Sequence, residues 1–340
     1  MSVNRAAYLS PDHRFELRHI PVPEPRPGEA RVRIVAQGIC GSDVHFFTEG
    51  RLGNFVVERP YIPGHEACGV IEAVGEGVES VASGDHVAIE PGLPCGRCDL
   101  CRKGRYNLCP DVYFLSEPPK DGTFRDMLTI REDGLHPMPE GLSFEAGALA
   151  EPLAVGAHGV SFVPSPAGAS AIVLGCGPIG LLTMLAFRCA GGGRITAVEP
   201  VEARRQRALE LGAVEAFEPE AAGDCSADAV FVTAGSSAAA RQAIRLARPG
   251  GTVVQIGWPE ANEFPVDVAV LMEKELALRG VNRYANAFPA ALAWLADGRI
   301  PVDKLITHRF AFEQIEEAFR YVRDHPDEVV KALVLQEGTD

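Results

Sequence analysis

Four of the nine cysteines are concentrated in one short segment of the sequence. They follow the spacing C-x2-C-x2-C-x7-C and are Cys95, Cys98, Cys101 and Cys109. Four thiolates on a glycine-containing loop suit tetrahedral zinc, and a closed four-cysteine shell is structural rather than catalytic. An iron–sulfur cluster and a nucleic-acid-binding zinc ribbon use similar ligands, whereas four unrelated free thiols are the least expected alternative. We therefore predict a structural zinc in a lobe spanning about residues 90–112.

A second group of metal-ligand types lies nearer the N-terminus. Cys40 stands in QGICGSDVH, and His65 and Glu66 stand in PGHEACGV. An open catalytic zinc needs three protein ligands and one further position for water or substrate. Cys40 and His65 would supply two ligands, and the third should be a carboxylate, either Glu66 or Glu151. Zinc with one thiolate and one carboxylate is neutral and stays electrophilic, so we expect one glutamate to ligate while the other holds the water or substrate.

Two further residues follow Cys40 closely and could move a proton. Zinc acidifies a bound hydroxyl, so that a hydride can then pass to a nicotinamide. Ser42 and His45 are candidates to relay the released proton to solvent, since the unperturbed pKa of histidine is about 6.5. A lone cysteine or histidine is more often a buried structural residue. The joint occurrence of this group with the second metal lobe and with a nucleotide motif favours chemistry.

That motif is GCGPIG, whose glycines are Gly175, Gly177 and Gly180. It follows the apolar run AIVL and opens a helix that we expect from about Pro178 to Ala190. The glycines would let the chain turn tightly and approach a pyrophosphate at the helix N-terminus. Glu199 ends the next expected strand and would bind ribose hydroxyls, which favours NAD over NADP. Arg204 and Arg205 complicate this preference, because an arginine can bind a 2′-phosphate, although Arg204 could instead stack on the adenine. The alternative is a glycine-rich turn without a ligand.

The arrangement of apolar runs predicts two domains in 340 residues, because single cores stop growing at roughly 250–300 residues. Short strand-like runs broken by Gly and Pro fill about the first 150 residues, and strand–turn–helix units follow from Ser170 to about residue 280. The fold class is therefore α/β. A net charge of −14 argues against nucleic acid as a partner. No apolar stretch suits a membrane span, and the N-terminus lacks the features of a signal peptide, so we expect a cytoplasmic protein.

Six segments together resemble the zinc-containing medium-chain dehydrogenase/reductase superfamily and, within it, the polyol (sorbitol/xylitol) dehydrogenases: CGSDVH, GRLGNFVVERP, GHEACGVIEAVGEGV, GALAEPLAVGAH, LGCGPIG and VNRYAN. The resemblance covers essentially the whole chain. It implies a GroES-like, mainly-β catalytic domain at 1–153, a Rossmann doubly wound parallel sheet at 154–285, and a segment at 286–340 that returns to the catalytic domain. It also implies a small-molecule polyol substrate, NAD, one catalytic and one structural Zn²⁺, and a homotetramer or homodimer.

The resemblance further implies roles for individual residues. Cys40, His65 and Glu66 would bind zinc, and Glu151 would hold the metal-bound water or substrate. Around NAD it places the glycines of GCGPIG together with Ile179, Glu199, Arg204, Ile256, Gly257, Trp258, Val281, Asn282 and Arg283. Around the polyol it places Phe46, Phe114, Glu151, Arg283 and Tyr284.

Two departures bear on the substrate and on the subfamily. Animal polyol dehydrogenases often carry a tyrosine where Phe46 stands, so one hydroxyl partner for the substrate is missing here. Several animal members lack the four cysteines that this chain retains. L-threonine dehydrogenases and other secondary-alcohol dehydrogenases share the metal motifs and form the alternative among enzymes. A zinc-less relative kept as a binding or structural protein is the alternative from another class, and the intact metal ligands speak against it.

Overall fold

The computed structural model describes residues 4–223, 225–259 and 263–336, which divide into two compact units. The first unit contains the described residues up to Glu151, then Leu295–Gly298, and those from Val302 onward. The second contains Pro152–Trp294 and Arg299–Pro301. The C-terminal segment that we expected from residue 286 thus stays with the second unit as far as Trp294. Helix α9 (Phe288–Ala296) carries the chain across this boundary, and its buried face includes Phe288, which packs on Tyr284.

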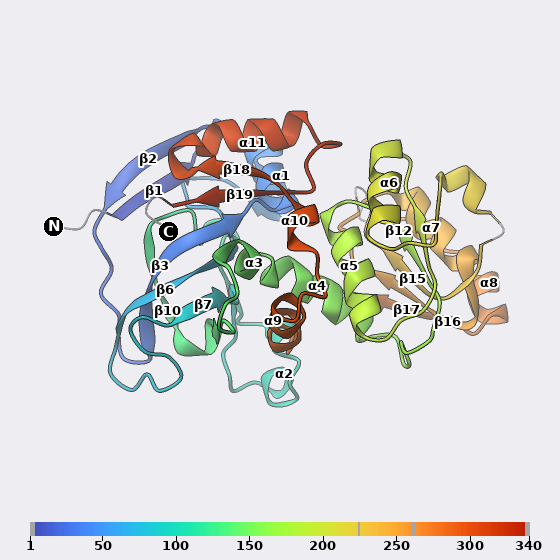
Figure 1. Ribbon diagram of the computed structural model, residues 1–340, viewed down its shortest axis with the longest axis horizontal. Helices are drawn as coiled ribbons and strands as arrows, with labels where there is room; N and C mark the ends of the chain where they lie inside the picture. The colour runs from blue at the N-terminus through green and yellow to red at the C-terminus, as the bar shows by residue number, and fades with distance from the viewer. Residues whose placement is uncertain (1–3, 224, 260–262, 337–340) are drawn as a thin grey trace. The chain divides into compact units, whose positions relative to one another are not determined.

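The first unit is built around a seven-stranded sheet with the order β11-β7-β6-β3-β19-β18, in which β10 also pairs with β3. Its long central strand β3 pairs antiparallel with β6 on one side and β19 on the other, so that the C-terminal strand lies inside the sheet beside an N-terminal one (Figure 1). The strands are β3 (Glu29–Gly38), β6 (Glu66–Val74), β7 (His86–Ile89), β10 (Met127–Arg131), β11 (Leu135–Pro137), β18 (Ile306–Ala311) and β19 (Lys331–Leu335).

Alternating burial explains why these runs form a sheet with a filled interior. Val32 and Ile34 of β3 are fully buried with Ile71, Val87, Ile89 and Leu128 of neighbouring strands. A second cluster lies among the pair β1 and β2 and helices α1 and α11, and holds the rings of Phe47, Tyr61, Phe124 and Phe319. Burial of such side chains is the main stabilising term, at roughly 25 cal/mol per Å². The elements around this second cluster are β1 (Asn4–Leu9), β2 (Phe15–Ile20), α1 (Gly41–Glu49) and α11 (Ile315–Asp324).

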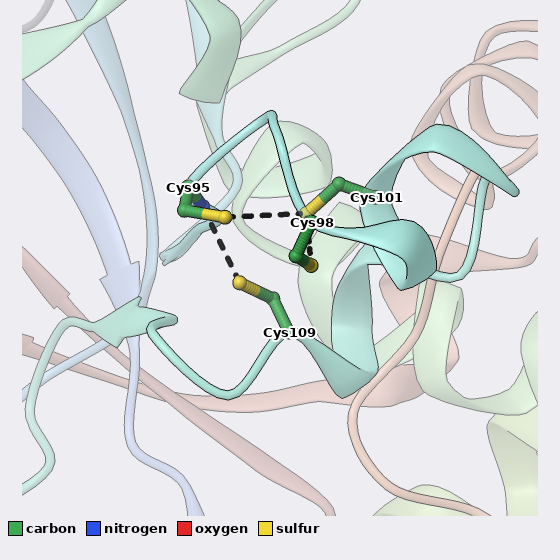
Figure 2. Close-up of side chains that lie close together, drawn as sticks. All are labelled: Cys95, Cys98, Cys101 and Cys109. Carbon is green, nitrogen blue, oxygen red and sulfur yellow. Dashed lines mark hydrogen bonds between the residues drawn. The ribbon is translucent and has the colours of Figure 1, made fainter.

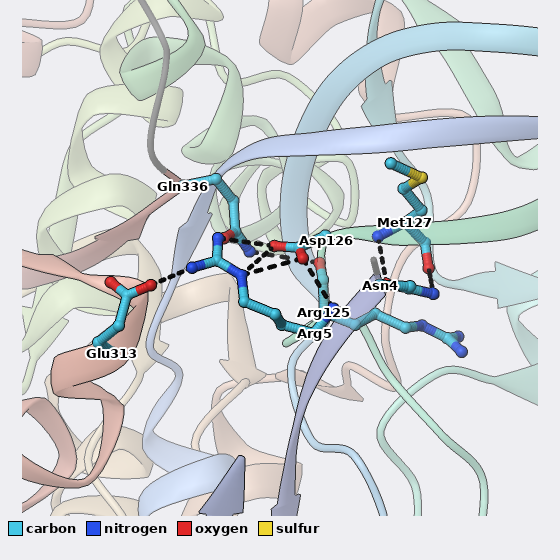
Figure 3. Close-up of polar contacts among 7 residues, drawn as sticks. All are labelled: Asn4, Arg5, Arg125, Asp126, Met127, Glu313 and Gln336. Atoms are coloured by element: carbon cyan, nitrogen blue, oxygen red, sulfur yellow. Dashed lines mark hydrogen bonds and ion pairs between the residues drawn. The ribbon is translucent and has the colours of Figure 1, made fainter. Parts of the chain in front are cut away.

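Polar contacts tie the two ends of the first unit together (Figure 3). Asn4 exchanges two hydrogen bonds with the backbone of Met127, of 3.1 and 3.0 Å. The guanidinium of Arg5 binds Asp126 at 3.0 Å and also bonds to Glu313 from the C-terminal part of the chain. These contacts fix β1 against β10 and against the segment that leads into α11.

The second unit is a six-stranded parallel sheet with the order β14-β13-β12-β15-β16-β17. This order reverses next to the first strand, which is the doubly wound arrangement predicted from the sequence. The central strands Ala171–Leu174 and Ile195–Val198 are fully buried, as expected for strands covered on both faces, whereas the edge strands Glu215–Phe217 and Ala277–Gly280 are half-buried and largely exposed. The strands are β12 (Ala171–Leu174), β13 (Ile195–Val198), β14 (Glu215–Phe217), β15 (Ala227–Val232), β16 (Ala247–Gln255) and β17 (Ala277–Gly280), and the helices are α5 (Pro178–Cys189), α6 (Glu202–Glu210), α7 (Ser237–Leu246) and α8 (Val268–Glu273).

The remaining helices are short connections or lie at the boundary of the units. They are α2 (Asp99–Arg102), α3 (Phe144–Ala148), α4 (Ala150–Val160) and α10 (Val302–Leu305). Across the described residues, no helix combines the length and the apolar character needed to cross a membrane.

Candidate metal centres and nucleotide site

The four-cysteine lobe brings its sulfur atoms together in the manner of a tetrahedral metal site (Figure 2). All four sulfurs lie within 4.8 Å of one another. The Sγ atoms of Cys98 and Cys101 are 3.4 Å apart, and those of Cys95 and Cys101 are 4.0 Å apart. A tetrahedral zinc with Zn–S bonds of about 2.3 Å would set its sulfurs roughly 3.8 Å apart. Backbone N–H groups of Arg97 and Cys98 lower the pKa of Cys95 to about 6, whereas burial and the neighbouring cysteines raise the pKa of Cys101 to about 12, so Cys95 is the thiol that ionises more readily before a metal binds.

A buried carboxylate that no sequence motif marks anchors this lobe to the sheet. Glu90 follows β7 and is 4% exposed. Its Oε1 accepts a hydrogen bond of 2.8 Å from the Tyr106 hydroxyl, within the lobe, and its Oε2 lies 2.7 Å from Nε2 of His136 on β11. Tyr106 precedes Cys109 by one turn, and its carbonyl accepts the N–H of Cys109. Glu90 thus connects the position of the fourth cysteine to the core of the first unit.

The second cluster comprises Cys40, His65 and Glu66, whose ligand atoms also lie within 4.8 Å of one another. Cys40 immediately precedes α1, and Glu66 begins β6 directly after His65. Gly38 pairs with Glu66 across β3 and β6. A Cβ atom at Gly38 would lie 2.0 Å from Oε2 of Glu66, so only glycine leaves room for this carboxylate. The cluster provides one sulfur, one nitrogen and one oxygen ligand, the mixed set expected of an open catalytic zinc site.

A buried aspartate holds the histidine of this cluster. Asp43 lies on α1, fully buried, with Oδ2 3.6 Å from Nδ1 of His65. Its Oδ1 accepts hydrogen bonds from the Ser116 hydroxyl at 2.8 Å and from the Gly64 N–H at 3.2 Å. Burial opposes the charge on each group, but their mutual attraction prevails, lowering the pKa of Asp43 and raising that of His65, to which Cys40 also contributes. At 3.6 Å the pair is an ion pair rather than a hydrogen bond, and the carboxylate favours a proton on the ring nitrogen that faces it, which leaves the other ring nitrogen for the metal.

Glu66 is held by a buried lysine from the far end of the chain. Nζ of Lys331, the first residue of β19, lies 2.8 and 2.7 Å from the two carboxylate oxygens of Glu66. Glu151 is buried in the first turn of α4 and lies outside the set that meets the 4.8 Å limit, although its charge also acts on Lys331. Among the two glutamates that we considered as the third ligand, Glu66 is therefore the one that lies with Cys40 and His65.

The residues predicted to contact the substrate or to relay its proton differ in their burial and in their distance from this cluster. The ring of Phe114 lies 5.7 Å from the ring of His65 and provides an apolar neighbour. Phe46 instead packs in the core against Tyr61 and is 5% exposed, which gives no support for a contact with substrate. Ser42 is half-buried in the first turn of α1. His45, one turn later, is exposed and bonds to Glu49 at 3.0 Å.

Sequence reasoning missed Asp43, Ser116, Lys331 and Glu90. Asp43 carried a signal, since it stands three residues after Cys40 inside CGSDVH, one helical turn away. The other three stand in segments without a motif, and only the folded chain brings them to the metal clusters.

In the second unit, each glycine of GCGPIG has its own physical reason. Gly175 has a φ of +97°, which favours glycine. A Cβ at Gly180 would lie 1.9 Å from the Gly175 carbonyl oxygen, so this glycine permits close packing of α5 on the turn. A Cβ at Gly177 would meet nothing within 4 Å, and Gly177 caps the N-terminus of the twelve-residue helix α5. The turn therefore offers an open approach to helix N–H groups, which suits a pyrophosphate. Ile179 lies in the first turn of this helix.

The charged residues after β13 separate into two groups. Glu199 is buried, and its carboxylate accepts the backbone N–H groups of Cys176 at 2.7 Å and Val201 at 3.0 Å. Arg205 is also buried, and its guanidinium binds Glu202 and Glu218. The guanidinium of Arg205 is thus occupied by carboxylates, whereas Arg204 is half-buried and its charge acts on Cys176 within the glycine turn. Of the two arginines considered for a 2′-phosphate, only Arg204 lies toward the turn.

The remaining candidates for the nucleotide lie at the ends of β16 and β17. The N–H groups of Ile256 and Gly257 both donate to the Val232 carbonyl, at 2.8 and 2.9 Å, and the Val281 N–H donates to Gln255 at 2.9 Å. Trp258 is 58% exposed. Asn282 follows Val281, Arg283 has a φ of +55°, and Tyr284 is 3% exposed against Phe288, so the chain turns sharply after β17.

Comparison with known proteins gives consistent matches. Residues 26–140 match the alcohol dehydrogenase GroES-like domain, and residues 178–297 match the zinc-binding dehydrogenase domain. The chain is 37% identical to a sorbitol dehydrogenase of Bacillus subtilis (strain 168), over 97% of this chain and 96% of that protein. It is 37% identical to an L-idonate 5-dehydrogenase of Vitis vinifera, over 93% of this chain and 90% of that protein. The solved structure of a 2R,3R-butanediol dehydrogenase from Bacillus subtilis superposes with a TM-score of 0.88 at 32% identity, covering 98% of this chain and 99% of that one.

Proposed function

The chain belongs to the zinc-containing, GroES-like dehydrogenase family, within its polyol dehydrogenases, and on that premise we propose that it oxidises a secondary hydroxyl of a polyol to the ketone with NAD. The observation that carries the proposal is the meeting of Cys40, His65 and Glu66, with ligand atoms within 4.8 Å, in a chain that also holds a complete dinucleotide turn. The ketose is the expected product from sorbitol or xylitol.

The roles of the residues follow from their contacts. Bound zinc supplies a Lewis acid that makes the substrate hydroxyl more acidic, and bound NAD supplies the hydride acceptor. Cys40, His65 and Glu66 would hold the metal, with Asp43 beside His65. Ser42 and His45, which is exposed on the same helix, would move the substrate proton toward solvent. The four-cysteine lobe would hold a second, structural zinc.

The substrate class rests on Glu151 and on the relatives. Sorbitol, L-idonate and 2,3-butanediol, which name the similar proteins, all carry a hydroxyl next to the one oxidised. Glu151 is buried beside the cluster and would accept a hydrogen bond from that neighbouring hydroxyl. A simple alcohol offers no second hydroxyl for this hydrogen bond, and the loss of one hydrogen bond to a buried polar group costs roughly 1–3 kcal/mol.

The experiment compares polyols, simple alcohols and L-threonine by the absorbance of NADH. Sorbitol or xylitol should exceed 2-propanol by at least about a hundredfold in kcat/KM, and Glu151→Ala should remove much of that preference or abolish turnover. If the protein oxidises L-threonine with a higher kcat/KM than every polyol, it is an L-threonine dehydrogenase and the polyol proposal is wrong. A protein that binds no zinc and reduces no NAD belongs to the binding or structural class.

For the nicotinamide cofactor, we propose NAD rather than NADP. Glu199 lies at the end of β13 as a buried carboxylate that a 2′-phosphate would approach, and Arg205 is occupied by two glutamates. We expect NAD to be preferred at least about tenfold in kcat/KM, which Glu199→Ala should narrow. Equal use of the two cofactors by the native enzyme would contradict this. A cytoplasmic location and a homotetramer or homodimer complete the proposal, and light scattering tests the latter.

A further inference from the structure

Lys331 is a buried cation whose position the proposed chemistry does not require. It is 3% exposed, and Glu66 is fully buried. The ammonium donates to both carboxylate oxygens of Glu66 at 2.7 and 2.8 Å. Its third donor bond goes to the carbonyl of Ile39 at 3.2 Å, directly before Cys40. One ammonium thus bonds to a proposed zinc ligand and to the residue preceding another.

The charges around Lys331 explain why it stays protonated at this depth. Glu66 supplies a compensating negative charge in direct contact with Nζ, and Cys40 and Glu151 lie near enough for their charges to act on the ammonium as well. These three residues are the anionic groups that we associate with the zinc. Taking a carboxylate out of water costs several kcal/mol unless a counter-charge and hydrogen bonds compensate it. In the chain without metal, Lys331 is the cation that contacts the buried carboxylate of Glu66.

We propose that Lys331 is the resident counter-cation of the catalytic metal site, which keeps Glu66 and Cys40 assembled before zinc enters and neutralises the second glutamate once it has entered. The inference rests on the proposed zinc site. Zinc with Cys40, Glu66 and Glu151 would carry a net charge of −1, and Lys331 brings the set to zero. When the charge of Lys331 is included, both glutamates can lie at one metal that stays electrophilic. The charge argument from the sequence, which did not include a lysine, allowed only one glutamate to ligate.

The proposal has a thermodynamic signature that does not depend on activity. Without Lys331, the metal-free protein keeps a buried and uncompensated carboxylate and is destabilised. The zinc-loaded protein suffers less, since the metal itself compensates Glu66. Stabilisation by bound zinc should therefore grow when the lysine is replaced. A lysine that served only to pack β19 would leave the gain from zinc unchanged.

The experiment measures the thermal midpoint Tm of Lys331→Met with the catalytic zinc present and after its removal by a chelator, with zinc content determined in both states. We expect the gain in Tm from zinc to exceed that of the native protein by at least about 6 °C. Lys274→Met is the matched control, because Lys274 also donates through Nζ, but to the carbonyls of Arg245 and Ala247 rather than to a carboxylate. This control should lower both midpoints together. An equal gain from zinc in Lys331→Met and the native protein overturns the proposal.

A second measurement covers the case in which Lys331→Met does not fold without metal. The double variant Lys331→Met with Glu66→Gln removes both charges at similar volume, so its metal-free form should fold and melt nearer the native value. If the metal-free double variant is no more stable than the single Lys331→Met variant, the charge pairing is not the cause and the proposal fails. The zinc content of the native protein separates this result from the proposed function. Native protein that retains only the lobe zinc would contradict the catalytic site itself, whatever the variants do.

Discussion

The two metal clusters of the first unit reach similar compactness by opposite routes. In the lobe, all four ligands come from one fifteen-residue segment, are all sulfur, and are mostly only half-buried. In the catalytic cluster, Cys40 meets His65 and Glu66 from a different segment, and a lysine 265 residues beyond Glu66 compensates the carboxylate. The ligands of the lobe are brought together mainly by its own loop. The catalytic cluster depends on the sheet that places β3, β6 and β19 side by side.

The largest expected effect is the loss of turnover when a ligand of the catalytic cluster, rather than of the lobe, is removed. Cys40→Ala removes one catalytic ligand, so turnover should fall at least about 10³-fold, because the Lewis acid is no longer held. Zinc content should fall from about two to about one per chain, measured by elemental analysis. Cys68→Ala is the control, since Cys68 is a buried cysteine of the same unit whose thiol donates to the Phe144 carbonyl rather than joining the cluster. Retention of both zinc ions in Cys40→Ala would contradict the assignment.

Removal of a ligand from the four-cysteine lobe should lower the stability of the protein more than its kcat. Cys98→Ser should remove the lobe zinc and lower Tm by about 5 °C or more, because metal binding contributes to folding wherever the ligands lie in one loop. Residual kcat should remain measurable at temperatures below the new midpoint. Cys225→Ser, outside both clusters, serves as the cysteine control. Unchanged zinc content and Tm in Cys98→Ser would remove the structural zinc from this protein.

A subtler change tests whether the lobe is as independent as its sequence spacing suggests. Tyr106→Phe removes the hydrogen bond to Glu90 and leaves one carboxylate oxygen without that donor, at a cost of about 1–3 kcal/mol. We expect the lobe zinc to pass to a chromophoric chelator several times faster, with the catalytic zinc unaffected. Tyr113→Phe is the control, because that ring is 43% exposed near the same lobe. Equal release rates in the two variants would show that Glu90 does not anchor the lobe.

The smallest effect concerns the pH dependence of zinc uptake at the catalytic cluster. Asp43 and Cys40 raise the pKa of His65 in the metal-free protein, so a proton must leave before zinc can bind. Because the proton competes with the metal below the raised pKa, zinc affinity should increase with pH by up to about tenfold per unit for this one proton. Asp43→Asn removes the main attraction, lowers the pKa of His65 toward its ordinary value and should flatten the slope above about pH 6.5. Titration calorimetry gives the affinities, and identical slopes would exclude Asp43 from this role.

The two metal clusters differ in how much of their geometry could be predicted from the sequence, and the reason is physical. The four cysteines are near neighbours in the chain, so their spacing alone limits the distances between their sulfur atoms. The same holds for GCGPIG, whose strand, turn and helix are consecutive and whose Gly175 and Gly180 each permit a close local contact. Cys40, His65 and Glu66 were found through motifs. The charge argument left Glu66 and Glu151 open as the third ligand, the family resemblance favoured Glu66, and in the folded chain Glu66 is the one that lies with Cys40 and His65.

The sequence by itself determined the elements and the chemistry available: the lobe ligands, the nucleotide turn, and the change from short strands to a doubly wound sheet. Only the tertiary structure decided which buried charges face one another. Lys331 begins an apolar strand, and Glu90 directly follows another, so neither spacing nor periodicity marks them. Their partners are set by strand order and by the need of a buried carboxylate for a counter-charge or a donor, which is a property of the packed interior.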